Sequence, residues 1–306
     1  MKHPKPTLIS FSLDLPKHYR AQEILKFHAR DPEQLAERIT ANSITKAIIL
    51  SGHPTFIHIE FGSQAAHCTF ETDDQLLSLP RAQHNAKGLL GLVIDVKSFE
   101  RKLEGDKLLG ELISRQKGLR IPQAASPFEA LTWAIIGQQI NVRFAVQLRH
   151  SLIRLTNLLD PHIRSNSLIC YPDATLVSRL SADQLGAHKF SRAKAETLLK
   201  VSQLVLNGTL PLDDWQQAGY DAIFIQNALL EVKGIGPWTA HYTLMRGYGY
   251  ADCSLHGDVA VRNALAKIDC SDASPTAKAT EAVLAQYAPY RSLVAAHLWA
   301  SLKVTE

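Results

Sequence analysis

The segment that decides the fold reads Leu229-Leu230-Glu231-Val232-Lys233-Gly234-Ile235-Gly236-Pro237-Trp238-Thr239-Ala240. Its apolar first part is typical of a helix end, the two glycines allow a tight reversal, and Pro237 suits the first turn of a second helix. The first N–H groups of a helix have no partner within it, so a hairpin of this kind can hold a phosphate. For a Gly-x-Gly alone, a plain connection between two helices is the alternative.

An acidic residue, Asp258, follows the hairpin in the run Leu255-His256-Gly257-Asp258-Val259. Apolar residues then recur at helical spacing through Ile268, which places Asp258 near a helix N-terminus, where the helix dipole favours an ionised carboxylate. An ordinary N-cap aspartate is the alternative, and both readings can hold together, because capping would fix the carboxylate and keep it charged. Such a group can stabilise positive charge that develops on a sugar and help to activate water.

Trp238 and Tyr242 lie four positions apart and therefore share one helix face, immediately after the hairpin. Two aromatic residues on one face are usually core residues. A wall of aromatic rings could also stack on an extruded base and attract a cationic one, and Trp299 on the last helix is a candidate for the same wall.

Polar and basic residues mark two further candidate contacts. Gln138 and Gln139 follow an apolar helix that Ser126-Pro127-Phe128-Glu129 predicts to begin with an N-cap serine and a proline in the first turn. Their amides either face solvent or enter a duplex. Lys189 and Arg192 belong to a basic stretch that is either a solvated helix start or a contact to phosphates.

The length and composition of the chain allow a large folded core but exclude few classes of protein. The chain has 306 residues, 46% hydrophobic and 20% charged, which is typical of globular proteins. A net charge of +4 suits a polyanionic partner but does not establish one. Cys68, Cys170, Cys253 and Cys270 lack metal-site spacing and are expected to be reduced, buried thiols. No membrane helix or signal peptide is apparent, so we expect a cytoplasmic protein, with no indication of an oligomer.

The chain changes character near residue 100. Residues 1–100 predict an α+β domain with antiparallel strands. Its strands are expected at Ile9–Leu15, Lys46–Leu50, Thr55–Phe61, Ala66–Phe70 and Leu89–Val96, with helices at Ala21–Ala29 and Pro32–Ala41. Residues 101–306 predict an all-helical region in two subdomains, a core of about 125–250 that contains the hairpin at 229–247, and a second formed by about 101–124 with 251–306.

Six segments together resemble the helix-hairpin-helix DNA glycosylase superfamily, and within it the AlkA type, 3-methyladenine DNA glycosylase II. They occur in the family's order and comprise Gly118–Pro122, Pro127–Asn141, Arg192–Ala195, Gly208–Pro211, Leu229–Gly247 and Arg291–Trp299. The resemblance implies an N-terminal domain like the TATA-binding protein and two helical subdomains with the active-site cleft between them. Residues 1–100 match only in their mixed α/β pattern.

The resemblance also implies roles for individual residues. Asp258 would be the catalytic carboxylate, and Trp238, Tyr242 and Trp299 would line the base pocket. Main-chain groups of the hairpin, at Gly234, Ile235, Gly236 and Thr239, would bind a DNA phosphate. Carbonyl groups of Leu230, Val232 and Ile235 would hold a monovalent cation there, Na⁺ or K⁺. Gln139 falls at the position of the residue that enters the duplex, and Gln138, Lys189 and Arg192 are the further candidate DNA contacts.

Differences between this chain and the motifs of related glycosylases refine the activity that the resemblance implies. Relatives that also cut the strand carry a lysine just after the Gly-x-Gly, as a Schiff-base nucleophile, and at that place this chain has Trp238. Relatives with an iron–sulfur cluster carry four closely spaced cysteines near the C-terminus, which this chain lacks. Some AlkA-type members have a leucine wedge and a second acid before the catalytic aspartate, where this chain has Gln139 and Gly257.

The resulting hypothesis is a monofunctional DNA glycosylase that acts on double-stranded DNA. It would flip out alkylated purines, 3-methyladenine above all, and hydrolyse the N-glycosidic bond, with Asp258 stabilising an oxocarbenium-like transition state or attacking the sugar directly. Two alternatives stay open: a glycosylase for an oxidised purine, and a non-catalytic helix-hairpin-helix protein that binds DNA.

Overall fold

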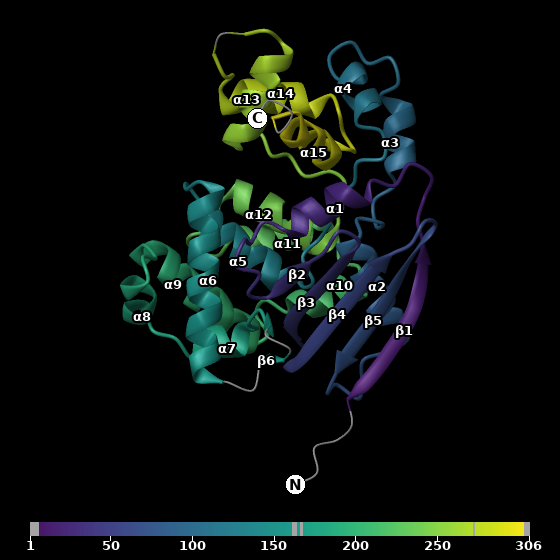
Figure 1. Cartoon of the computed structure of the whole chain (residues 1–306). Helices are drawn as coiled ribbons and strands as arrows, with labels where there is room; N and C mark the ends of the chain where they lie inside the picture. Colours follow the sequence, from purple (N-terminus) through teal and green to yellow (C-terminus); the bar gives the residue numbers. More distant parts are fainter. Residues whose placement is uncertain (1–5, 161–163, 166–167, 272, 303–306) are drawn as a thin grey trace.

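The computed structural model describes residues 6–160, 164–165, 168–271 and 273–302. The N-terminal part is a five-stranded antiparallel sheet in the order β1-β5-β4-β3-β2 (Figure 1). Its strands are β1 (Thr7–Asp14), β2 (Glu37–Ile39), β3 (Ser43–Leu50), β4 (His53–Phe61) and β5 (Ala65–Thr72). Along β1 the less exposed residues alternate with exposed ones, which confirms the predicted half-buried strand. Two helices, α1 (Ala21–His28) and α2 (Leu79–Leu89), pack beside this sheet.

The predicted helix Pro32–Ala41 is wrong. The segment contains turns and then β2, in which Glu37 pairs with Lys46 of β3. The Glu37 carboxylate is buried and accepts a hydrogen bond from Lys46 Nζ at 2.5 Å. A buried ion pair across two strands is a tertiary interaction, and here it overrides the local helix preference.

The predicted strand Leu89–Val96 is also wrong. Leu89 is the last residue of α2, and Gly91 then reverses the chain with a φ of +65°. A new helix, α3 (Val96–Lys102), begins after Asp95, whose carboxylate accepts a hydrogen bond from the N–H of Ser98. The apolar run is a buried helix end followed by a turn, which a short apolar stretch does not distinguish from a strand.

Helices make up most of the remaining chain (Figure 1). The central one is α5 (Pro127–Gly137), which packs against helices on several sides and is buried over most of its length. Its predicted start is confirmed, because the Ser126 Oγ accepts a hydrogen bond from the N–H of Glu129 at 3.1 Å. The elements around it are α6 (Val142–Leu159), α7 (Ala174–Ser178), α8 (Ala182–Ala187), α9 (Arg192–Leu206), α10 (Leu212–Ala218), α11 (Ala222–Leu230), α12 (Pro237–Thr243) and the π-helical turn η2 (Leu244–Tyr248).

A second group of helices gathers at the top of Figure 1. It comprises α3, α4 (Gly110–Arg115), α13 (Val259–Ile268), α14 (Ala277–Ala285) and α15 (Arg291–Leu302). Segments far apart in the chain meet here: Phe99 packs on Tyr290 with ring centroids 5.8 Å apart, and the Lys102 Nζ donates to the Ala288 carbonyl at 2.6 Å. The residue boundaries predicted for the domains stay a prediction.

The N-terminal sheet and the helical region share one buried junction. Two short strands, β6 (Arg164–Ser165) and β7 (Leu168–Ile169), lie between α6 and α7. Tyr171 then exchanges backbone hydrogen bonds with Ala47 and Ile49 on either side of β3 residue Ile48, at 2.9 and 3.0 Å. The junction therefore joins the two parts through main-chain bonds as well as side chains.

Three of the four cysteines match the expectation of buried thiols, and the fourth does not. Burial raises the pKa of Cys68, Cys170 and Cys253 to about 12, so these thiols stay protonated at neutral pH. Cys270 is exposed, because it follows the C-terminal end of α13. In the part of the chain that the structure describes, none of the helices combines the length and apolar character that a membrane span requires.

Candidate active site

Asp258 is held by three N–H donors from three different elements. It is the N-cap of α13, where its Oδ1 accepts a hydrogen bond from the N–H of Val261 at 3.0 Å. The indole Nε1 of Trp238 in α12 donates to Oδ2 at 2.9 Å, and that of Trp299 in α15 donates to Oδ1 at 3.1 Å. Both oxygens thus serve as acceptors, as they do in an ionised carboxylate. The structure thereby brings the predicted carboxylate and two predicted aromatic residues together.

The predicted aromatic residues form a continuous wall. The ring centroids of Trp238 and Tyr242 lie 5.2 Å apart, and those of Tyr242 and Trp299 lie 6.4 Å apart. A fourth ring joins them from α5, because the Trp133 Nε1 donates to the Tyr242 hydroxyl at 3.0 Å. The sequence analysis missed Trp133, whose only signal is its place in an apolar helix that also predicts a core residue.

This wall faces a cleft of about 1610 Å³. The cleft is bordered by the hairpin, by the loop that follows α5, by the start of α13 and by α15. Three residues of α1 and its C-terminal end also line it, Glu23, Phe27 and Arg30, so the N-terminal domain contributes to the candidate site. No motif in the sequence marks these residues, because their part in the cleft depends on how the two domains dock.

The two hairpin glycines have different structural roles. Gly234 has a φ of +96°, and a Cβ there would lie 2.1 Å from Thr197 Oγ1, so this position requires glycine. Gly236 is the N-cap of α12 with an extended φ of −101°, which any residue adopts. A Cβ at Gly236 would meet no atom within 4 Å, and the α12 N-terminus has no side-chain cap. The lack of a side chain at Gly236 leaves this end open toward the cleft.

The loop between α5 and α6 contains both predicted glutamines, and they differ in orientation. The Gln138 amide nitrogen donates to the Gly234 carbonyl and to Thr239 Oγ1, each at 2.9 Å, and so braces the hairpin. Gln139 is exposed, lines the cleft and has a left-handed φ of +55°. For a residue other than glycine this conformation costs about 1–2 kcal/mol. It turns the loop so that Gln139 rather than Gln138 lies at its tip.

The predicted basic contacts lie outside the lining of the cleft. Lys189 is exposed and has a φ of +71° in the turn before α9. Arg192, at the first position of α9, is exposed and pairs with Glu196 at 2.7 Å. Their role as contacts to DNA stays a prediction.

Of the carbonyl groups predicted to hold a cation, that of Leu230 ends α11, and those of Val232 and Ile235 lie in the turn between α11 and α12. The carbonyl oxygen of Val232 accepts the N–H of Ile235 at 3.0 Å, which leaves it a second lone pair. Neutral carbonyl oxygens suit a monovalent ion, so the donor set fits the implied Na⁺ or K⁺. Among the described residues, no group of three or more His, Cys, Asp or Glu side chains is placed to hold a metal ion.

The chain matches two known protein families, one in each of its two regions. The AlkA N-terminal domain family matches residues 10–126, and the HhH-GPD superfamily of base excision DNA repair proteins matches residues 132–289. The chain belongs to the HhH-GPD superfamily. The site of this superfamily member thus combines a hairpin, an aromatic wall and a carboxylate in one cleft.

Individual relatives cover from about two thirds to nearly all of the chain. A DNA-3-methyladenine glycosylase of Bacillus subtilis is 23% identical over 94% of this chain and 95% of its own length. DNA-3-methyladenine glycosylase 2 of Escherichia coli is 29% identical over 62% of this chain and 63% of its own. The solved 3-methyladenine DNA-glycosylase of Archaeoglobus fulgidus has a TM-score of 0.78 at 18% identity, covering 94% of this chain and 97% of that one, and shows that the two share a fold.

Proposed function

We propose that this HhH-GPD protein is a monofunctional glycosylase that removes alkylated purines from double-stranded DNA, 3-methyladenine and related N3- or N7-alkylated bases. The observation that carries the proposal is the Asp258 carboxylate, bonded by two indole N–H groups of the aromatic wall at 2.9 and 3.1 Å. The names of the Bacillus subtilis and Escherichia coli relatives point to the same base. A protein that only binds DNA has no need of a carboxylate oriented in this way.

The reaction follows from the charges on the two sides of the bond to be broken. A base alkylated at N3 or N7 carries a positive charge, stacks against aromatic rings and leaves as a neutral molecule. As the bond between the base and the sugar C1′ breaks, its electron pair moves to the base and C1′ becomes positive. Asp258 stabilises that charge, and a water molecule then adds to C1′ and releases a proton to the solvent.

Trp238 supports the proposal that the reaction stops at the abasic site. A strand-cutting relative needs an amine at this position to attack C1′. An indole has no nucleophilic amine, and here its N–H is bonded to Asp258. Water is therefore the molecule that adds to the sugar C1′.

The contacts to DNA proposed for the hairpin and its neighbouring loop follow from their shapes. The open N-terminus of α12 at Gly236 would bind a phosphate through main-chain N–H groups, and a monovalent cation on the hairpin carbonyls would add positive charge there. Gln139 would enter the duplex at the place of the extruded base. Structures of Schizosaccharomyces pombe Mag1 and of MBOgg1 with DNA ligands show relatives of this fold bound to DNA.

The central test is Asp258→Asn. Asparagine also caps helices, so the start of α13 should persist while the negative charge is lost. We expect release of 3-methyladenine and 7-methylguanine from duplex DNA to fall by roughly two orders of magnitude or more, with DNA binding retained. Asp269→Asn, at the exposed C-terminal end of the same helix, is the matched control and should leave base release unchanged.

A panel of duplexes with single lesions separates the alternatives. Near-normal release by Asp258→Asn would contradict the role of Asp258. Release of 8-oxoguanine alone by the wild-type protein would identify a glycosylase for an oxidised purine. Release of no base, with duplex binding intact, would identify a DNA-binding protein without this activity.

A further inference from the structure

Arg246 is a buried cation beside the aromatic wall that neither the sequence motifs nor the proposed reaction uses. It lies in η2, directly after the helix that carries Trp238 and Tyr242, and its exposed fraction is 5%. Its Nη1 donates to the Pro122 carbonyl at 2.6 Å, and its Nε has no hydrogen-bond partner. Leaving a donor unsatisfied in a buried site is costly, so its retention calls for a reason other than stability.

The guanidinium contacts the rings that form the candidate base pocket. Its carbon Cζ lies 5.8 Å from the ring centroid of Trp299, 6.0 Å from that of Tyr242 and 4.4 Å from that of Phe27. Arg246 lines the cleft and also a cavity of about 80 Å³ that adjoins it. The cation therefore lies next to the place proposed for the extruded base.

Nearby carboxylates do not neutralise this charge. Asp31, Glu37 and Glu129 line the adjoining cavity, but Arg149 pairs with all three, and Lys46 with the two glutamates. No salt bridge to Arg246 occurs within the described residues; besides Tyr242 of the aromatic wall, the group that acts on it is another cation, Arg30.

Arg246 nevertheless stays protonated. Burial lowers the pKa of the Arg246 guanidinium to about 10. Tyr242 acts to raise this pKa and Arg30 to lower it further, and the value is still well above neutral pH. A positive charge shielded from water acts over a longer distance than one on the surface. The aromatic wall thus has a carboxylate, Asp258, bonded to it and a buried cation, Arg246, beside it.

We propose that Arg246 is a specificity-determining residue that favours departure of the base and weakens binding of cationic bases, an inference that rests on the glycosylase function proposed above. When the glycosidic bond breaks, its electron pair moves to the base. A cationic base becomes neutral and a neutral base becomes an anion, so in both cases the charge of the base falls by one. A fixed positive charge beside the base stabilises that change, while Asp258 stabilises the positive charge on the sugar.

Loss of the Arg246 charge should therefore affect cleavage of the glycosidic bond and binding of the base differently. Removing the positive charge should slow bond cleavage for cationic and neutral bases alike. It should also strengthen binding of a cationic base, because the repulsion in the ground state disappears, and leave binding of a neutral base nearly unchanged. Loss of a residue that only maintained the fold would not lower kcat and KM together.

The test compares Arg246→Met, which removes the charge at similar length, with Arg246→Lys, which keeps it. Duplexes with 7-methylguanine, a cationic base, and with hypoxanthine, a neutral one, serve as substrates. For Arg246→Met we expect kcat to fall about tenfold on each base that the wild type releases, and KM for 7-methylguanine to fall about threefold or more. Arg246→Lys should stay within about threefold of the wild-type kcat.

Several results would overturn the proposal. One is an unchanged kcat in Arg246→Met, and another is an equal loss of kcat in the Met and Lys variants, which would indicate a structural role. Thermal unfolding and binding to an abasic duplex report on the fold. If Arg246→Met does not fold, Arg246→Gln, which can still donate to the Pro122 carbonyl, replaces it. Failure of the wild-type protein to release 7-methylguanine would instead count against the proposed function.

Discussion

At the scale of single residues, Trp238 and Asp258 each make two kinds of contact in the site. Trp238 contributes an aromatic ring to the wall and an N–H to the Asp258 carboxylate. Asp258 caps a helix and faces the cleft, so the two readings of this residue that its sequence context allows are compatible. The dual use explains why a carboxylate can be held at one place by side chains that also shape the pocket.

Trp238→Phe separates these two tasks. The substitution keeps an aromatic ring and removes the N–H that donates to Asp258 Oδ2, so the carboxylate loses one of its donors. We expect kcat for base release to fall about tenfold, which corresponds to about 1–2 kcal/mol. Single-turnover assays with excess enzyme measure this change.

Tyr242→Phe is the matched control for that variant. It removes a hydroxyl of the same wall that accepts a hydrogen bond from Trp133, whereas the donors to Asp258 are Trp238, Trp299 and Val261. It should lower thermal stability and change kcat by less than about threefold. Equal losses of kcat in both variants would mean that the ring wall, and not the bond to Asp258, limits the reaction.

At the scale of elements, the hairpin between α11 and α12 depends on one glycine for its shape and on the other for its openness. Gly234 combines a positive φ with close contact to Thr197 of α9. Gly236 has neither constraint. Gln138 fastens the hairpin from the opposite side through two hydrogen bonds, which couples it to the loop that carries Gln139.

Alanine substitutions at the two glycines should therefore have opposite consequences. Gly234→Ala would place a Cβ 2.1 Å from Thr197 Oγ1 and strain the backbone, and we expect a loss of about 2–4 kcal/mol in the free energy of unfolding. Gly236→Ala should change that free energy by less than about 0.5 kcal/mol and weaken duplex binding at least about threefold, because a methyl group would crowd the phosphate. Urea unfolding and fluorescence anisotropy measure the two effects. If both variants bound duplex DNA as tightly as the wild type, this would contradict the phosphate contact proposed for the hairpin.

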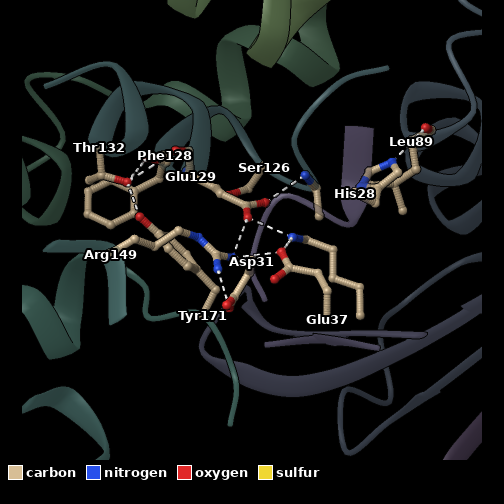
Figure 2. A network of polar contacts seen from close by, with 12 residues as sticks. His28, Asp31, Glu37, Leu89, Ser126, Phe128, Glu129, Thr132, Arg149 and Tyr171 are labelled. Atoms are coloured by element: carbon tan, nitrogen blue, oxygen red, sulfur yellow. Dashed lines mark hydrogen bonds and ion pairs between the residues drawn. The ribbon is translucent and has the colours of Figure 1, made fainter. Parts of the chain in front are cut away.

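At the scale of the whole molecule, buried ion pairs join the sheet to the helical region (Figure 2). The Lys46 Nζ of β3 lies 2.5 Å from Glu37 Oε1 and 2.6 Å from Glu129 Oε1, and the Arg149 Nη2 of α6 lies 2.6 Å from Glu37. Burial lowers the pKa of Lys46, but the two glutamates more than offset this and raise it overall. Burial raises the pKa of Glu37, but Arg149 and Lys46 outweigh it and lower that pKa to about 2.

Removal of one ion from this network should be costly. Lys46→Met leaves Glu37 and Glu129 buried with one cation fewer, and we expect a loss of about 3–5 kcal/mol in the free energy of unfolding. Lys26→Met removes a cation from an exposed pair with Glu23 and should cost less than about 1 kcal/mol. Urea titrations at neutral pH compare the two variants. Equal effects would mean that the junction tolerates an unpaired charge.

Residues 229–258 and the start at Ser126 were predictable because their signals are local. A positive φ at Gly234, the proline in the first turn of α12 and the Ser126 cap each follow from the chemistry of a few neighbouring residues. The alternating pattern of β1 has the same origin. The segments Pro32–Ala41 and Leu89–Val96 were predicted wrongly because pairing with β3 and burial at a helix end decided them, and neither is visible in local sequence.

The hairpin, the capping carboxylate, three of the aromatic residues of the wall and the order of the two regions were all readable from local sequence. Only the tertiary structure decided that both indole N–H groups point at Asp258, that Trp133 joins the wall and that α1 lines the cleft. It also placed Arg246 beside that wall with no acidic partner among the described residues. Hydrogen-bond direction, burial and the balance of charge depend on residues that come together from distant parts of the chain. The local sequence of one segment does not specify which residues of other segments will contact it.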